Sequence, residues 1–185
     1  GPANLLECEL PLIDYTELLA RHGKATAKAY YNADGWAAFH ASDVWGTTAP
    51  VYPSSMTSGS GKKKSLCYNH LPTSGAWLAH NVYEYYAFGQ DKNFMQERIW
   101  PIVSGAADFL VDYLYPWPDG TFTSMPSWSS EHGTISKGAT TDHAIAREML
   151  SCALELAQSM GTTNECTAEW LKVRAASEEK AGGSL

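Results

Sequence analysis

Glu131 is the residue whose type and surroundings first suggest chemistry. It lies in the segment PSWSSEHG, residues 126–133, three positions after Trp128 and directly before His132. Hydrolysis of a glycosidic bond needs a carboxylic acid that protonates the leaving oxygen and a second carboxylate that activates water or attacks. A partly dry aromatic pocket formed with Trp128 would keep the Glu131 carboxyl group protonated near neutral pH. The residues alone leave two interpretations open, a proton donor in a carbohydrate site or a solvated charge on a loop.

A second cluster of suitable side chains lies in GWAAFHASDVWG, residues 35–46. His40 and Asp43 stand there between Trp36 and Trp45. Histidine and aspartate form hydrogen bonds with sugar hydroxyl groups, and the flat face of an indole ring can stack on the C–H surface of a sugar. The alternative is a turn that is capped by the aspartate and flanked by two buried indole rings.

Other reactive side chains lack the spacing of a known site. The cysteines, four in number, show no CxxC spacing, which argues against a zinc or redox motif and leaves both disulfide pairing and free buried thiols open. Neither serine before Glu131 lies in a GxSxG elbow, so a serine nucleophile is disfavoured. A metal site would also lack recurring ligand spacing, so no metal and no cofactor are expected. The residues considered for such a site are His40, Asp43, His70 and His80.

Composition excludes several classes of partner. The chain has 185 residues, which suffices for one sizeable core, and its formal net charge is −7. An acidic chain is a poor ligand for nucleic acid, and the one basic run, Lys62 to Lys64, is too short to form a binding face. No stretch approaches the length of apolar residues that a membrane-spanning helix needs. The chain is nevertheless rich in Trp and Tyr, with 7 and 10 residues against 5 Phe, which suits a sugar cleft as well as a core.

The elements that must position these side chains are predicted to be helices. Helical periodicity and stop signals predict helices over 10–31, 73–89, 92–100, 101–115, 140–161 and 164–180, with a flexible tail over about 178–185. No alternating run of strand length stands out apart from GTFTSM at 120–125, so the predicted fold class is all-α. Long connections over 32–72 and 115–140 hold most candidate site residues, and long loops of this kind commonly carry function. Such loops at one end of a helical array would form the cleft of an α/α toroid. The chain is too short to close a toroid, so we expect an arc of helix hairpins.

Four segments, in order, resemble the catalytic domain of glycoside hydrolase family 95, the α-L-fucosidases that act on α-1,2-linked fucose. GWAAFHASDVWGTTAP (35–50) resembles the family pattern GW-x-x-HHNTD-x-W-x-x-TAP, and the segment from GAWL to DYL (75–114) resembles its GAWL-x-x-H-x-WEHY block and the helices that follow. GTFTSMPSWSSEHG (120–133) resembles the block that ends in PS-x-SPEN, and GATTDHAIAREML (138–150) resembles GPTMD-x-QI-x-x-ELF. The resemblance implies that residues 1–185 are part of an (α/α)6 catalytic domain.

The resemblance also implies a mechanism and a set of site residues. The family inverts the anomeric centre, with a glutamate as general acid and an aspartate-activated water as nucleophile, and Glu131 occupies the place of the acid. The family's base aspartate and the asparagine pair that orients the water are expected outside this sequence, so this chain alone is not expected to turn over substrate. The residues expected to bind substrate are His40, Asp43, Trp77, His132 and Asp142.

Departures from the family pattern surround Glu131. His132 replaces the asparagine that follows the acid, and Ser130 replaces the proline that precedes it. The expected partner is a fucosylated oligosaccharide or glycan, and the resemblance implies an extracellular or periplasmic protein. An α-L-galactosidase of the same family is one alternative, because galactose differs from fucose by one hydroxyl group. A non-catalytic carbohydrate-binding or scaffold remnant is another.

Overall fold

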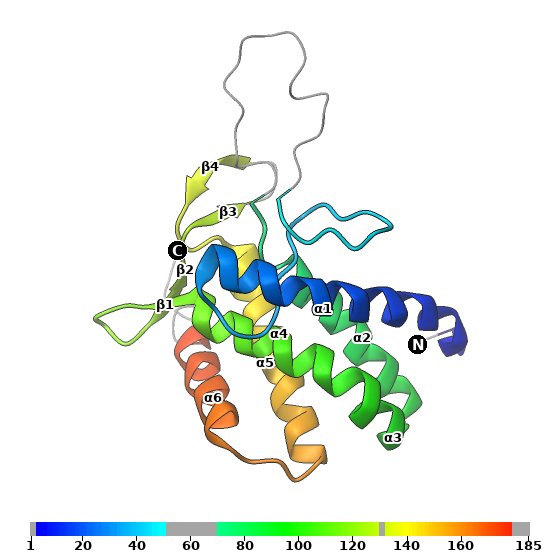
Figure 1. Cartoon of the computed structure of the whole chain (residues 1–185). Coiled ribbons are helices and arrows are strands. Elements are labelled where there is room, and N and C mark those ends of the chain that lie inside the picture. The colour runs from blue at the N-terminus through cyan, green and yellow to red at the C-terminus, as the bar shows by residue number, and fades with distance from the viewer. Residues whose placement is uncertain (1–2, 51–69, 130–131, 179–185) are drawn as a thin grey trace, which may run out of the picture.

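Helices make up most of the part of the chain that the structure describes. The computed structural model describes residues 3–50, 70–129 and 132–178 (Figure 1), so the tail predicted over about 178–185 lies outside the described residues except for Glu178, which ends α6. A 3-10 turn (Leu6–Glu9) precedes the first helix. The helices are α1 (Leu10–Tyr31), α2 (Ser74–Gly89), α3 (Lys92–Phe94), α4 (Trp100–Tyr113), α5 (Thr140–Ser159) and α6 (Glu165–Glu178). The predicted all-α fold class is confirmed.

Local signals in the sequence explain where these helices begin and end. The Asp91 side chain accepts hydrogen bonds from the backbone N–H groups of Asn93 and Phe94, as expected of a residue that caps a helix N-terminus. The chain then continues from α3 through a π-helical turn (Met95–Ile99) into α4, so the two helices predicted here form one continuous run. Pro101 lies inside this continuous run, just after the π-helical turn, and because proline has no N–H group the helix lacks one backbone hydrogen bond there.

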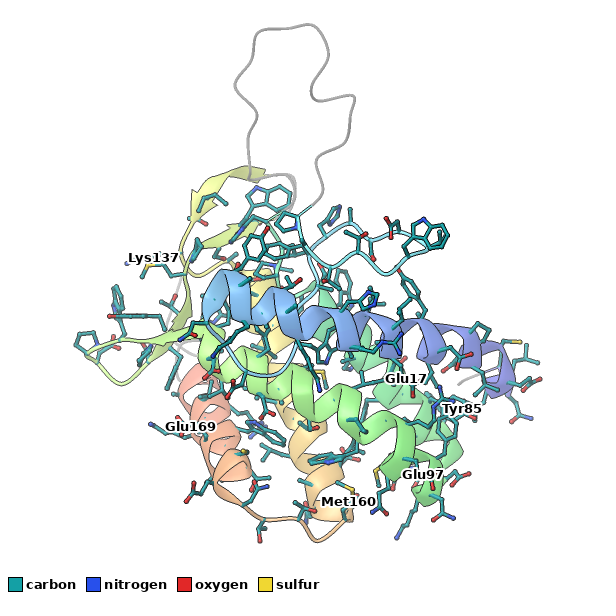
Figure 2. All side chains as sticks on the ribbon, viewed as in Figure 1. Glu17, Tyr85, Glu97, Lys137, Met160 and Glu169 are labelled. Carbon is teal, nitrogen blue, oxygen red and sulfur yellow. The ribbon has the colours of Figure 1, made fainter. Side chains whose placement is uncertain are left out.

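The helices form two sets that run in opposite directions. Arg98, near the start of the α3–α4 run, donates to Glu17 in the first half of α1 at 2.6 Å (Figure 2), and the rings of Tyr31 and Tyr113 meet near the ends of α1 and α4. Therefore α1 and α4 run parallel. A hydrogen bond between the starts of α2 and α5 shows that these two helices begin where α1 and α4 end. One end of the array consequently gathers two helix N-termini and two helix C-termini.

The indole of Trp36 is packed between helices rather than exposed to a ligand. It is 1% exposed, and its Nε1 donates to the carbonyl oxygen of Ile102 at 2.8 Å. Glycines make this close approach possible, because a Cβ atom at Gly75 would lie 2.7 Å from Trp36 Cζ3 and one at Gly105 would lie 2.9 Å from Trp36 Cδ1. Side chains there would force the helices apart. Trp36 therefore belongs to the core, and the idea that its face stacks on a sugar is wrong for this structure.

Two short hairpins occupy the connection between α4 and α5. The first pairs β1 (Leu114–Pro116) with β2 (Phe122–Ser124), and the second pairs β3 (Ser127–Ser129) with β4 (His132–Ser136), both antiparallel. The strand suggested by GTFTSM is confirmed as β2, whereas the other strands were not predicted. In Figure 1 the β3–β4 hairpin and the loop over 40–47 emerge from the same side of the helices. The described parts of these two loops thus lie on one side of the helices, and the 40–47 loop runs back along α1, where Tyr15 donates to the carbonyl oxygen of Asp43.

Candidate active site

The β3–β4 hairpin brackets the proposed acid. Ser129 of β3 pairs with His132 of β4, so residues 130 and 131 connect the two strands. Glu131 itself lies outside the described residues, as does the side chain of His132, whose backbone belongs to β4. Trp128 in β3 is 2% exposed. The indole that was expected to line an aromatic pocket beside the acid is therefore packed inside the protein.

Asp142 is a fully buried carboxylate in the first turn of α5. It is 0% exposed, and it accepts hydrogen bonds from three hydroxyl groups that lie far apart in the sequence. Thr73, before α2, donates to Oδ1 at 2.8 Å, while Ser127 of β3 and Tyr113 at the end of α4 donate to Oδ2 at 2.7 and 3.1 Å. Buried carboxylates are stable when their lone pairs are satisfied in this way, and the α5 N-terminus adds a favourable dipole.

The carbonyl oxygen of Pro126 extends this polar cluster. It accepts a hydrogen bond from the Tyr113 hydroxyl at 2.7 Å, and a protonated Nε2 of His70 donates to it at 3.3 Å. The Tyr31 hydroxyl lies 3.5 Å from the same His70 nitrogen. Burial, followed by the charge of Asp142, raises the pKa of both tyrosines, so both phenols keep their protons and Tyr113 stays a donor at neutral pH. We define Asp142, Ser127, Tyr113 and Thr73 as the Asp142 cluster.

Most members of this neighbourhood were missed from the sequence. Asp142 was a candidate, but Thr73, Tyr113 and Ser127 were not. Thr73 is the first residue of the helix predicted over 73–89, where a threonine would be expected to cap the helix, but its hydroxyl group bonds to Asp142 and makes no capping hydrogen bond. No local pattern marks Tyr113 or Ser127, whose hydroxyl groups meet the carboxylate only through the tertiary fold.

The carboxylate of Asp43 is used within its own loop. It accepts hydrogen bonds from the backbone N–H groups of Trp45 and Thr47 at 3.0 and 3.1 Å and from the Thr47 hydroxyl at 2.9 Å. The hydrogen bonds from Thr47 lower the pKa of Asp43 below its ordinary value. Trp45 is 79% exposed and His40 is also exposed. The interpretation as an aspartate-capped turn therefore fits Asp43, and the exposed indole and imidazole remain available to a ligand.

Trp77 is the other exposed aromatic candidate. It lies one turn into α2, is 56% exposed and lines a shallow depression of about 190 Å³ between α2 and α5. The remaining lining residues are His80, Ala144, Ile145 and Glu148. In the hairpin region, the ammonium group of the exposed Lys137, labelled in Figure 2, lies 4.7 Å from the centre of the Trp117 ring.

Three further sequence-based expectations concern the whole chain. Within the described ranges, no group of three or more histidine, cysteine, aspartate or glutamate side chains is arranged to hold a metal ion. Cys8, Cys152 and Cys166 carry free thiols, while Cys67 lies outside the described residues. Burial raises the pKa of the Cys152 thiol to about 12, so it stays protonated. In the described part of the chain, no helix has both the length and the apolar character that crossing a membrane requires.

Comparison with known proteins assigns the chain to a family. Residues 1–183 match the family described as the glycosyl hydrolase family 95 catalytic domain, and the chain belongs to this family of glycoside hydrolases. It is 32% identical over 173 residues to Alpha-L-fucosidase 2 of Arabidopsis thaliana, an alignment that covers 89% of this chain and 19% of that protein. It is 29% identical over 128 residues to Probable alpha-fucosidase A of Aspergillus niger, covering 66% of this chain and 15% of that protein.

A more distant similarity covers about half of the chain. The MMP endo-(1,4)-3-O-methyl-alpha-D-mannosidase of Mycolicibacterium hassiacum is 32% identical over 95 residues, covering 51% of this chain and 24% of that protein. The chain thus spans about a fifth of the length of Alpha-L-fucosidase 2, although the alignment covers 89% of the chain. The resemblance predicted from four sequence blocks is confirmed at the level of the family.

Proposed function

We propose that the full-length protein is an inverting exo-glycosidase that releases terminal α-L-fucose from α-1,2-linked fucosylated glycans. The observation that carries this proposal is the similarity of nearly the whole chain to Alpha-L-fucosidase 2. The parallel α1–α4 and α2–α5 pairs support an arc of an (α/α)6 toroid, whose loops would form the substrate cleft at the end that holds the Asp142 cluster. The family's sugar chemistry further supports an extracellular or periplasmic location.

In this proposal Glu131 is the general acid. Its carboxyl group gives a proton to the glycosidic oxygen as the bond to the anomeric carbon breaks. A water molecule attacks the opposite face of the sugar and loses its proton to a second carboxylate, roughly 6.5–9.5 Å from the acid. We do not assign that base to Asp43, which is engaged with its own loop, or to Asp142, which is buried. His132 follows the acid directly, and a protonated imidazole there would favour the ionised carboxylate.

The other candidates bind the glycan in this proposal. His40 would donate or accept hydrogen bonds to sugar hydroxyl groups, and Trp77 would offer an indole face, since both are exposed. Asp43 would shape the loop that carries His40 through the turn described above. The full burial of Asp142 argues for an indirect role, which is developed in the next subsection.

The experiment compares Glu131→Gln with wild type in the full-length protein. The substitution keeps the shape of the side chain but removes the transferable proton, so kcat on a fucosylated glycan should fall by about 10²–10⁴-fold. An aryl α-L-fucoside with an acidic leaving group should lose much less, because that group departs with little protonation. Glu97→Gln, an exposed carboxylate at the opposite end of the array (Figure 2), is the matched control and should leave both rates unchanged.

Three outcomes separate the alternatives. Preferred hydrolysis of aryl α-L-galactoside would replace fucose by galactose as the substrate. Binding of fucosylated glycans without hydrolysis of either sugar would favour a non-catalytic remnant. Glycan hydrolysis by Glu131→Gln at the wild-type rate would remove Glu131 from the role of acid.

A further inference from the structure

The base of the β3–β4 hairpin is tied to helix α5 by a buried hydrogen-bond network. Ser127 is 0% exposed, and its hydroxyl donates to Asp142 at 2.7 Å while accepting from the backbone N–H of Ala139 at 3.0 Å. Ser127 also pairs with Ser136 across the hairpin. Ser127 therefore connects β3 to the start of α5 through its side chain, and to β4 through its backbone pairing.

The Tyr113 hydroxyl makes a second tie to the same segment. It lies 2.7 Å from the carbonyl oxygen of Pro126 and 3.1 Å from Oδ2 of Asp142, so it bridges the residue before β3 and the buried carboxylate. Tyr113 is itself 3% exposed. The buried charge of Asp142 thus organises two adjacent residues at the start of the hairpin.

We propose that Asp142 is a positioning residue for the general acid, acting through Ser127 and Tyr113 on the hairpin that contains Glu131. This inference rests on the proposed function, because it needs Glu131 to be the acid. Only Ser130 separates Ser129, the last residue of β3, from Glu131, and the hairpin pairs Ser129 with His132. In this proposal, a shift of Ser127 at the start of β3 is carried along the strand toward Glu131, and small misplacements of a catalytic group are costly.

Full burial separates this role from substrate binding. Asp142 has no exposed surface, and both of its oxygens accept hydrogen bonds from protein hydroxyl groups. Replacing a residue that binds the sugar should change KM for every substrate that contacts it. Replacing a residue that positions the acid should instead lower kcat, most of all for substrates whose leaving group must be protonated.

The test uses Ser127→Ala and Tyr113→Phe in the full-length protein, because each substitution removes a hydrogen bond to Asp142 and keeps the buried carboxylate. Each variant is assayed on a fucosylated glycan and on an aryl α-L-fucoside with an acidic leaving group. We expect kcat on the glycan to fall by about 10–100-fold, with a smaller loss on the aryl fucoside and little change in KM. Asp142→Asn should change the ratio of the two kcat values in the same direction.

A stability control distinguishes positioning from general loosening of the fold. Ile99 is 0% exposed and lies in the π-helical turn at the opposite end of the array, so Ile99→Val should lower Tm and leave the ratio of the two kcat values at its wild-type value. An unchanged ratio in Ser127→Ala and Tyr113→Phe, or an increase in KM on both substrates, would overturn the proposal.

Glu131→Gln, measured in parallel, separates failure of this inference from failure of the proposed function. Normal glycan hydrolysis by Glu131→Gln would refute the acid, and the positioning role with it. A strong loss in Glu131→Gln combined with an unchanged ratio in Ser127→Ala would refute the positioning role alone.

Discussion

The carboxylate of Asp142, at the start of α5, accepts a 2.7 Å hydrogen bond from the hydroxyl group of Ser127, which lies 15 positions earlier in the second hairpin. Both residues are completely buried. Charged groups are rarely buried without partners, because an unsatisfied charge in the interior is unstable. The hydroxyl groups around Asp142 supply those partners, and these hydrogen bonds hold the β3–β4 hairpin against the helices.

Replacing Asp142 by alanine should destabilise the protein strongly. The substitution removes the acceptor of the buried Thr73 and Ser127 hydroxyl groups, whereas Tyr113 keeps the carbonyl oxygen of Pro126, and each lost hydrogen bond to a charged group weakens the fold. We expect the free energy of unfolding to fall by about 3 kcal/mol or more, measured by urea denaturation with circular dichroism. Asp14→Ala is the control: Asp14 pairs with Arg98, but its side chain is 67% exposed, so the loss should stay below about 1 kcal/mol. Equal losses in the two variants would contradict this explanation.

The helices could be predicted from the sequence because their signals are local. α1 covers the predicted range, and it ends where Asn32 adopts a left-handed conformation with φ 51°. Asp91, a residue type that favours helix N-termini, directly precedes the α3–α4 run and caps it. Apart from β2, which GTFTSM suggested, the strands gave no such signal, and the three-residue strands β1 and β3 are too short to show an alternating pattern.

The environment of the site residues could not be predicted for a related reason. Trp36 looked like a loop tryptophan because no local pattern shows that Gly75 and Gly105 leave room for its ring. Likewise, Tyr113 ends a helix and Ser127 begins a strand, and only the tertiary fold brings both hydroxyl groups to Asp142. Sequence blocks could indicate the family, but the burial of individual side chains depends on contacts between distant segments.

Gly35 should tolerate alanine far less well than Gly161 does. Both glycines have φ +66°, so alanine is strained by a similar amount at each position. A Cβ atom at Gly35 would collide with the carbonyl oxygen of Gly105 and lie 2.7 Å from the backbone nitrogen of Phe109, whereas nothing lies within 4 Å of the corresponding atom at Gly161. We expect a loss of about 1–2 kcal/mol for Gly161→Ala. Gly35→Ala should lose about 1–3 kcal/mol more, because overpacking adds to the strain.

Thermal unfolding of the two glycine variants checks this prediction. The larger decrease in Tm should belong to Gly35→Ala. Equal decreases would show that the close approach of Gly35 to α4 relaxes without cost.

The turn that Asp43 caps should loosen in acid. Hydrogen bonds from Thr47 lower the pKa of the Asp43 carboxyl group in the folded protein, so the ionised form stabilises the turn. This stabilisation is present above the ordinary aspartate pKa of about 4 and is lost as the pH falls through the lower pKa of the folded state. The amide proton of Thr47, which is bonded to Asp43, should report the transition by NMR chemical shift. The shift should not titrate in Asp43→Asn, and a midpoint above the ordinary aspartate range would contradict the prediction.

Asp108 should show the opposite pH dependence. Its Oδ1 accepts a 3.0 Å hydrogen bond from Nε1 of Trp170. Burial raises the pKa of Asp108, and the nearby charges of Asp112 and Asp34 raise it further, while the hydrogen bond from Trp170 opposes them. The unfolded chain therefore loses this proton at a lower pH than the folded protein does. Stability that is fully present below about pH 4 is lost as the pH rises through the pKa of folded Asp108.

Asp108→Asn should consequently be at least as stable as wild type at neutral pH. Asparagine keeps an oxygen acceptor for Trp170 but removes the partly buried charge and its repulsion from Asp112 and Asp34. The advantage of the variant should disappear below about pH 4, where Asp108 is protonated in both states of the wild type.

Asp112→Asn is the matched control. Asp112 is exposed and accepts a 2.7 Å hydrogen bond from the backbone N–H of Asp34, which a neutral side chain accepts less strongly. Urea denaturation at several pH values measures both variants. A loss of stability in Asp108→Asn that appears at neutral pH and disappears below about pH 4 would show instead that the charge of Asp108 stabilises the fold.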